Sequence, residues 1–433
     1  MGLRPSKPPV LSLPRVLQAL PLVLLVTLVT VLVVVRIRRL GGARSGAPFH
    51  AFPGADAAAE GNSLRAPPLA AASARVPEHV ARMQHGDARR SHRAHGHGPT
   101  EAKVAWKTQL DGPIQAQVVA SPDESVLYVA SLGGTLSALG RDGHVAWKVD
   151  LHGRVYSTPC VGNDGTVYVG SDARSFYAVA PTGTVRWKLD TESDADTGPA
   201  LAPNGTIVFA SGRTVYAVGP AGTVAWRFRA KGKVFTAPAV AEDGTMYVGA
   251  QDHRAYALAP NGTVRWSVDL GADVDGAPAI ADDGDVYFGT DADEIVRLSK
   301  DKGDIVWRAR VGGYVRGGLS IGRDGDVLAG VYGPLPRQVR VAAAGGKVLG
   351  AFDVAGTGAR DFGVHGGALE DDDGTLYFGG QDDAAYAVDR SGKLRWRFVT
   401  GADVDAPLTL LNDGSLVVAS DDGMVYLLAA LAH

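Results

Sequence analysis

Cysteine is almost absent from this sequence, which has Cys160 alone among 433 residues. A single cysteine excludes an intramolecular disulfide, a vicinal disulfide and every CxxC metal or redox motif. Phosphate-binding patterns are missing as well, because no GxGxxG or GxxxxGK[ST] loop follows a strand and opens a helix. No nucleophile, histidine and acid have a spacing that supports a catalytic set. We therefore predict no catalytic residue and no resident metal.

Net charge is also small over the whole chain, at −3, but it is unevenly distributed. Residues 1–100 carry 13 Lys and Arg against 4 Asp and Glu, whereas residues 101–433 carry 30 against 42. An acidic body repels the phosphates of nucleic acid, so nucleic acid is not an expected partner. The contrast also divides the chain near residue 100 into two physically different parts.

Long hydrophobic runs are limited to residues 16–35, twenty positions without a charge behind a basic tail at 1–15. Twenty helical residues span about 30 Å, the thickness of a bilayer core, so a transmembrane helix is predicted. A cleaved signal peptide is the alternative, but RIRRL follows the run where small residues would be needed. The flanking basic residues balance, so charge alone does not orient the helix.

Residues 36–100 are rich in Ala, Gly, Pro and Arg and hold six of the eleven histidines. Such a composition buries too little apolar surface to offset the loss of chain entropy. This segment is predicted to be a disordered linker. Histidine clusters can bind zinc or copper, but we predict no metal site in the linker.

The remainder, residues 101–433, repeats with a period of about 40 residues. Tryptophans recur four residues after a glycine, as in Gly262-Thr-Val-Arg-Trp266, and one repeat has lost its tryptophan, at Gly346-Lys-Val-Leu-Gly350. The period predicts eight repeats. The tryptophans are assigned a structural role because they keep one phase; they are Trp106, Trp147, Trp187, Trp226, Trp266, Trp307 and Trp396.

Glycine is abundant, at 56 residues, roughly twice the usual ~7%. Asp-Gly and Asn-Gly pairs precede apolar strands in nearly every repeat and favour type I′ turns in two-residue hairpins. In the second repeat the predicted strands are 153–161, 166–171, 175–180 and 184–189. Four short strands per repeat indicate an all-β, eight-bladed β-propeller of antiparallel blades.

The two ends of the repeat region are complementary. Residues 101–110 match a fourth strand without its first three, and residues 402–430 match three strands without a fourth. If the entering strand completes the last blade, the ring closes and no open sheet edge is left.

A GxVxW strand after a YAL or YAV strand, with DGTVYVG between, resembles the pyrroloquinoline-quinone (PQQ)-type propeller repeat. One group with this repeat is the PQQ-dependent dehydrogenases. For a PQQ-dependent dehydrogenase the resemblance implies long insertions, a vicinal Cys-Cys against the quinone, calcium held by Glu and Asn, and an Asp base. The other group is non-catalytic and includes the outer-membrane-protein assembly lipoprotein of the Bam complex. The lean blades here are more similar to the second group, although its lipid-anchoring cysteine is replaced by the predicted membrane helix.

The start of each first strand offers a candidate binding site, because the innermost strand of a propeller lines the channel. Counting back from a recurrent proline, Arg154, Asp194, Lys233 and Asp273 alternate in sign on four successive blades. A ring of interblade ion pairs is one interpretation. The other is a polar channel mouth that binds a cation, a sugar or a peptide. Its candidate residues are Asp196, Asp275 and Asp405, with Arg154 and Lys233.

We expect a monomeric, non-enzymatic propeller tethered by a single membrane pass, with the ring on the extracytoplasmic, periplasmic side of a bacterial envelope. It would act as a scaffold for protein partners. The irregular residues 331–337 and 357–365 either bind those partners or record the decay of one repeat. Two alternatives stay open: a PQQ-dependent oxidoreductase with calcium in the channel, and a carbohydrate-binding propeller.

Overall fold

The computed structural model describes residues 80–359 and 362–430. The predicted basic tail, transmembrane helix and most of the predicted linker therefore lie outside the described residues. Within the described part of the chain no helix is found that is long and apolar enough to cross a membrane.

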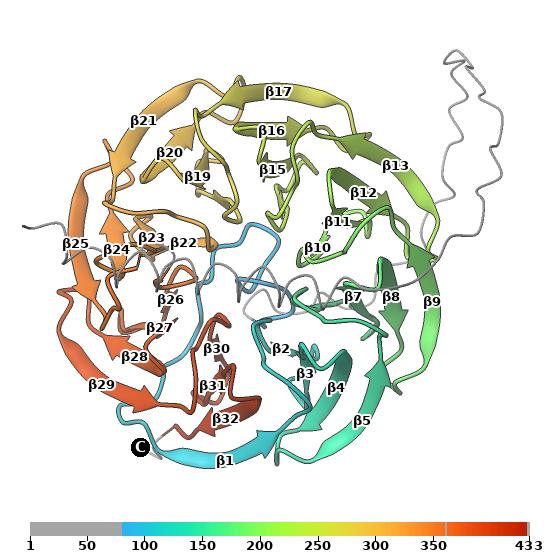
Figure 1. Cartoon of the computed structure of the whole chain (residues 1–433), viewed down its shortest axis with the longest axis vertical. Helices are drawn as coiled ribbons and strands as arrows, with labels where there is room; N and C mark the ends of the chain where they lie inside the picture. The colour runs from blue at the N-terminus through green and yellow to red at the C-terminus, as the bar shows by residue number, and fades with distance from the viewer. Residues whose placement is uncertain (1–79, 360–361, 431–433) are drawn as a thin grey trace, which may run out of the picture. The chain divides into compact units, whose positions relative to one another are not determined.

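The described residues form a closed ring of eight four-stranded antiparallel sheets (Figure 1). Blades 1 to 4 comprise β2 Val119–Ala120, β3 Val126–Ala130, β4 Thr135–Gly140, β5 Val145–Asp150; β6 Cys160–Val161, β7 Val167–Ser171, β8 Ser175–Val179, β9 Val185–Asp190; β10 Ala200–Leu201, β11 Ile207–Ser211, β12 Thr214–Val218, β13 Val224–Arg229; β14 Ala239–Val240, β15 Met246–Ala250, β16 Arg254–Leu258, β17 Val264–Asp269. Blades 5 to 7 comprise β18 Ala279–Ile280, β19 Val286–Thr290, β20 Glu294–Leu298, β21 Ile305–Arg310; β22 Leu319–Ile321, β23 Val327–Val331, β24 Arg337–Val341, β25 Val348–Asp353; β26 Leu369–Glu370, β27 Leu376–Gly380, β28 Ala384–Val388, β29 Leu394–Val399.

Blade 8 is assembled from both ends of the ring: β30 Thr409–Leu410, β31 Leu416–Ala419 and β32 Met424–Leu428 are completed by β1 Val104–Gln109. The pairing of β1 with β32 is antiparallel and places Lys107 opposite Tyr426. The predicted blade number, strand order and closure are therefore confirmed. Because β1 pairs with β32, the backbone N–H and C=O groups along that side of β32 are hydrogen-bonded rather than left as an open sheet edge.

The hydrophobic core lies between blades rather than in one central mass. One cluster combines Val208 and Val215 of blade 3 with Val248 and Leu258 of blade 4, all at most 1% exposed. Each middle strand has two faces, and each face packs on a neighbouring blade, so the strands are apolar throughout instead of alternating. A single blade therefore cannot bury its own surface, and the ring must form as a whole.

The inner strands are shorter than predicted. In blade 2 the first strand is Cys160–Val161 and not 153–161. The residues before it form a loop in which a side chain, rather than the backbone, hydrogen-bonds to the second strand. The Ser157 hydroxyl accepts from the Gly170 N–H at 3.2 Å and donates to the Thr197 carbonyl at 2.9 Å. Pro159 lacks an N–H, which also limits the ladder at this point.

The predicted type I′ turns are wrong. In the blade 2 turn, Gly165 has φ +76° but Asp164 is not in the positive-φ region, whereas a type I′ turn needs both central residues there. The Gly165 N–H donates to the Gly162 carbonyl, and the Gly162 N–H donates to the Thr166 carbonyl. The Asp164 carboxylate also accepts from the Thr166 N–H at 3.1 Å. This is a longer turn that ends in a left-handed glycine, because the aspartate side chain stabilises the bend.

Candidate functional site

Each face of the ring carries its own set of loops. The turn face holds the Asp-Gly turns and the turns before the outer strands. The loop face holds the turns after each second strand and the connections between blades.

On the turn face, residues 80–99, here called the strap, cross the centre of the ring; they are the blue segment ahead of β1 in Figure 1. Strap carbonyls accept from inner-strand N–H groups: Ala81 from Ala120, Arg82 from Val161, Ala88 from Val240, Arg89 from Ile280, and Ser91 from Ile321. The predicted disordered linker 36–100 is therefore corrected over residues 80–100. Composition misled here because backbone and buried polar contacts with the blades add to the burial of the few apolar residues of the strap.

Arg90 is the deepest strap residue, fully buried although it carries a charge. Its guanidinium donates to the carbonyls of Pro238 at 3.0 Å, Gln84 at 2.6 Å and Gly198 at 3.2 Å. Burial lowers the pKa of Arg90 to about 10, so it stays protonated at neutral pH. A buried cation surrounded by carbonyls of blades 3 and 4 and of the strap itself fixes the strap in one position.

Two strap histidines stack beside it: the rings of His85 and His92 lie 4.8 Å apart and nearly parallel. His85 Nδ1 is 2.9 Å from the Leu319 carbonyl, and the two ring nitrogens of His92 face the Gly367 and Leu408 carbonyls. Burial lowers the pKa of both imidazoles. These side chains occupy the channel at the turn face.

The loop face carries the predicted site residues. At four blade interfaces a repeated contact joins the turn after a second strand to the connection that enters the next blade; the two residues are 24 or 25 positions apart, except where the ring closes between Asp421 and Gln115. The pairs are Gln251 with Asp275 at 3.2 Å, Asp291 with Arg316 at 2.7 Å, Gln381 with Asp405 at 3.4 Å, and Asp421 with Gln115 at 2.7 Å. In each pair a carboxylate meets an amide or a guanidinium, so the interface is electrostatically matched.

The interface between blades 2 and 3 departs from that rule, because Asp172 stands opposite Asp196. Oxygens of Asp172, Asp194 and Asp196 lie within 4.8 Å of one another. Burial, followed by the hydrogen bond and the charge of Asp172, raises the pKa of Asp196 to about 8. One proton shared by this pair, or a bound cation, would relieve the repulsion.

A second carboxylate cluster, Asp273, Asp275 and Asp291, lies between blades 4 and 5. Burial raises the pKa of Asp275 to about 6, and the neighbouring acids add to the shift, while Gln251 and Arg316 oppose it. The guanidinium of Arg316 neutralises part of this cluster, which makes it less strained than the cluster at Asp196.

Asp405 lies at a third interface, between blades 7 and 8, and is 8% exposed. Beside it, burial and the charge of Asp405 raise the pKa of Asp403 to about 7. The three predicted aspartates thus occupy three different blade interfaces.

The two predicted basic residues lie at the same face, where the charge of Lys233 opposes the rise in the pKa of Asp196 and the charge of Asp172 adds to the rise in the pKa of Arg154. Arg154 is fully exposed, and contact with Tyr156 raises its pKa. The Lys233 ammonium lies 5.6 Å from the centre of the Phe235 ring. Among the described residues no ion pair joins either of them to Asp194 or Asp273, so the alternating charges do not form the ring of ion pairs that was one interpretation.

At seven blade interfaces an indole fills the outer edge. Six of the tryptophans donate their ring N–H to a carbonyl in the next blade's turn, at 2.8–2.9 Å. For Trp396 the acceptor is Pro99 of the strap. At six of the seven the ring also lies against a glycine of that turn; a Cβ at Gly303 would come 2.8 Å from the Trp266 ring.

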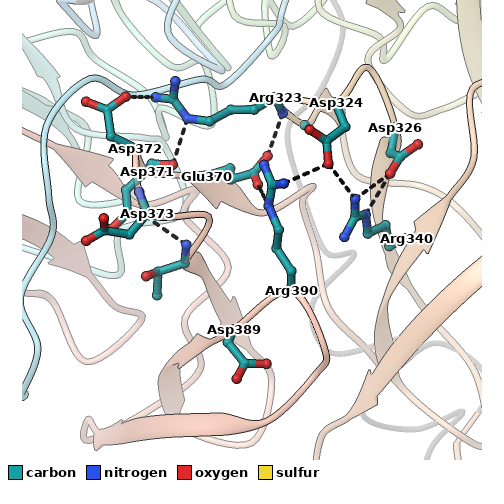
Figure 2. A network of polar contacts seen from close by, with 12 residues as sticks. Arg323, Asp324, Asp326, Arg340, Glu370, Asp371, Asp372, Asp373, Asp389 and Arg390 are labelled. Atoms are coloured by element: carbon teal, nitrogen blue, oxygen red, sulfur yellow. Dashed lines mark hydrogen bonds and ion pairs between the residues drawn. The ribbon is translucent and has the colours of Figure 1, made fainter.

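The eighth interface, between blades 6 and 7, has Gly350 in place of the indole. A polar network holds these two blades instead, and Figure 2 shows Arg340 and Arg390 converging on Asp324. Arg390 also donates to the buried Glu370 at 2.7 Å. Arg323 extends the network to Asp372.

Sequence reasoning missed the strap, the opposing Asp172 and this network. The signal for Asp172 was present, because Asp172, Gln251, Asp291, Gln381 and Asp421 share one phase of the repeat. No comparable periodic signal marks Arg90, whose partners are backbone carbonyls.

These features define the class of protein: an eight-bladed propeller of PQQ-type repeats with a blocked turn face and an acidic loop face. The family described as outer membrane protein assembly factor BamB matches residues 93–195, 175–259, 251–361 and 337–431. The matches extend over more than half of the chain, and the chain belongs to this family.

Solved structures share the fold. BamB from Moraxella catarrhalis is 17% identical, with a TM-score of 0.63 over 75% of this chain and 99% of that chain. Quinohemoprotein alcohol dehydrogenase from Comamonas testosteroni is 13% identical, with a TM-score of 0.68 over 83% and 82%. A europium-containing methanol dehydrogenase is 11% identical, with a TM-score of 0.67 over 79% and 90%. No curated protein sequence matches the chain.

Proposed function

We propose that this chain is a non-enzymatic binding scaffold of the bacterial envelope, anchored by residues 16–35, with its ring on the extracytoplasmic side. One observation carries the proposal: the channel is closed at the turn face by the chain's own strap, whose Arg90 and histidines are hydrogen-bonded to the blades. A ring whose channel is closed at the turn face leaves its outer edge and loop face for macromolecular partners. Membership of the assembly-factor family supports partners that are envelope proteins.

The oxidoreductase alternative has a specific observation in its favour, the carboxylate cluster of Asp172, Asp194 and Asp196. Carboxylate oxygens are ligands that calcium prefers. The quinone fits less well, because the strap occupies the turn-face side of the channel and Cys160 is the sole cysteine. A quinone would have to enter from the loop face.

The test is crosslinking of the full-length protein in its native membrane, followed by purification and mass spectrometry. A chain lacking residues 101–433 is the control. Envelope proteins that depend on the ring are the expected result. If no protein depends on the ring, the scaffold proposal fails. PQQ with calcium and a reducible dye, and a glycan array, then test the two alternatives on the same preparation.

A further inference from the structure

The interface between blades 6 and 7 contains a shallow hollow that is open to solvent along the outer edge of the ring. Here this hollow is called the notch. It is lined by Gln338, Arg340, Gly350, Phe352, Arg390 and Gly392, among others. Its position is where the other seven interfaces hold an indole. The seven indole sites therefore indicate which side chain would fit the notch in shape and in hydrogen bonding.

Two parts of the indole site are retained in the notch. Gly392 keeps the left-handed conformation of the other platform glycines, with φ +83°. A Cβ at Gly392 would meet nothing closer than the Ala351 carbonyl at 3.4 Å, whereas at the other platform glycines, such as Gly303 and Gly262, a ring lies within 3 Å. The carbonyl of Arg390, two residues before Gly392, holds the place of the Pro181 and Pro260 carbonyls that accept an indole N–H.

The walls of the notch favour an aromatic occupant over an aliphatic one. Arg340 and Arg390 line it, and Asp324 holds both guanidiniums in place. Guanidinium groups stack favourably on the electron-rich face of an aromatic ring, and indole is the best partner.

Gln338 is a second, independent sign that a ligand belongs in the notch. It is 3% exposed, and neither atom of its carboxamide has a partner within the described part of the chain. It pairs across strands with Phe352, as Arg340 pairs with Gly350, so all four share the face toward blade 7. The equivalent positions in other blades hold apolar residues, such as Ile295 and Val215. A buried amide without a partner is unfavourable, and a polar group of the docked segment beside the indole would reduce that cost.

The outer edge beside the notch is also unusually open. Four consecutive residues of β25, starting at Val348, are exposed, whereas the other outer strands bury or half-bury the residue at the tryptophan position. Val348 and Leu349 of β25 are 40% and 49% exposed, and Leu394 of β29, which begins just after Gly392, is 44% exposed. An extended segment that inserts one side chain into the notch would cover this apolar edge.

A tryptophan occupant cannot come from this chain. The sequence has seven tryptophans, and all seven are engaged within the ring. A second copy has none to offer for the same reason.

We propose that the notch is a docking site for a tryptophan side chain of a partner protein, held as the ring holds its own seven. This inference rests on the proposed scaffold function and names the chemistry of the partner. The indole N–H would donate to the Arg390 carbonyl, and the ring would lie on Gly392.

The first experiment titrates the full-length protein with N-acetyltryptophanamide and follows the methyl NMR signals of Leu376 and Val388, which line the notch. Shifts of these signals are expected, and N-acetylleucinamide should give none. Gly350→Trp fills the notch in cis and should abolish the shifts. Gly392→Asn is the second variant, because asparagine tolerates the left-handed conformation and its side chain would cover the platform.

A matched control opens the same hollow elsewhere: Trp147→Gly, at a more exposed indole, should add a second binding site beside Gly183 and leave the first unchanged. Absence of methyl shifts in the wild type, or equal shifts in wild type, Gly350→Trp and Gly392→Asn, would overturn the proposal.

The second experiment repeats the crosslinking with Gly350→Trp. Loss of a partner captured by the wild type supports the notch as its docking site. Equal capture refutes the notch and leaves the scaffold function intact. If the wild type captures no partner, the scaffold function fails, and the amide titration still decides whether the notch binds indole.

Discussion

Trp266 offers the sharpest test of how the blades are held together. It is 7% exposed, its indole donates to the Lys300 carbonyl of the next blade at 2.9 Å, and its ring lies against Gly303. Tyr247 packs on the same ring with centroids 5.7 Å apart. Replacing a buried tryptophan by alanine costs about 3–5 kcal/mol, because apolar burial is lost and a cavity is left.

Part of that cost belongs to the hydrogen bond alone. Trp266→Phe retains most of the apolar contact but removes the ring N–H, and a net hydrogen bond contributes about 0.5–1.5 kcal/mol. We expect the free energy of unfolding to fall by about 4 kcal/mol in Trp266→Ala and by about 1–2 kcal/mol in Trp266→Phe. Whole domains have only about 5–15 kcal/mol, so the alanine variant should be close to unfolding.

The assay is equilibrium urea unfolding, followed by the fluorescence of the six remaining tryptophans. Trp147→Ala is the matched control, because Trp147 makes the same contact with Pro181 but is more exposed. Its loss should be smaller. If Trp266→Ala loses less than about 1 kcal/mol, the interblade indoles do not stabilise the ring as argued.

Three further predictions concern buried polar groups. Asp196→Asn should raise the thermal midpoint, and the gain should grow from pH 5 to pH 8. The pKa of Asp196 is raised to about 8 in the folded state, so its stabilising contribution exists at low pH and is lost as pH rises from about 4 to about 8; an unchanged gain at all pH values would contradict this. Arg90→Met should lower stability by about 2–4 kcal/mol, because the Pro238 and Gly198 carbonyls lose their donor, and it should expose the strap to trypsin. An uncut strap would show that the carbonyl contacts are dispensable. Gln338→Leu should raise stability by about 1–2 kcal/mol in urea unfolding, and a loss would mean that the amide is paired.

The ring was predictable from the sequence because a repeat carries the same local information many times. The phase of the tryptophans predicted the blade boundaries, and the incomplete first and last repeats predicted that β1 pairs with β32. Each of these inferences depends on residues that are near one another in a single repeat.

The strap and the turn geometry were not predictable in the same way. Arg90 contacts carbonyls of residues 108 to 148 positions away, and carbonyls carry no side-chain signature. The Asp164 turn differs from type I′ because the side chain, rather than the dipeptide alone, decides the backbone conformation. The sequence singled out the aspartates of the loop face by their place in the repeat, but only the structure shows that Asp196 meets another acid while Asp275 and Asp405 meet amides.

Closure by β1 and β32 also means that the ring does not depend on the point at which the chain enters it. The Ala429 N–H donates to the Lys103 carbonyl at 2.8 Å, so the two ends of the ring are already in contact. A circular permutant joined there and opened at the Pro181 turn would contain the same eight blades. In that chain the strap would no longer precede the ring, and residues 80–99 would become a free peptide that binds the permuted ring or leaves its turn face open.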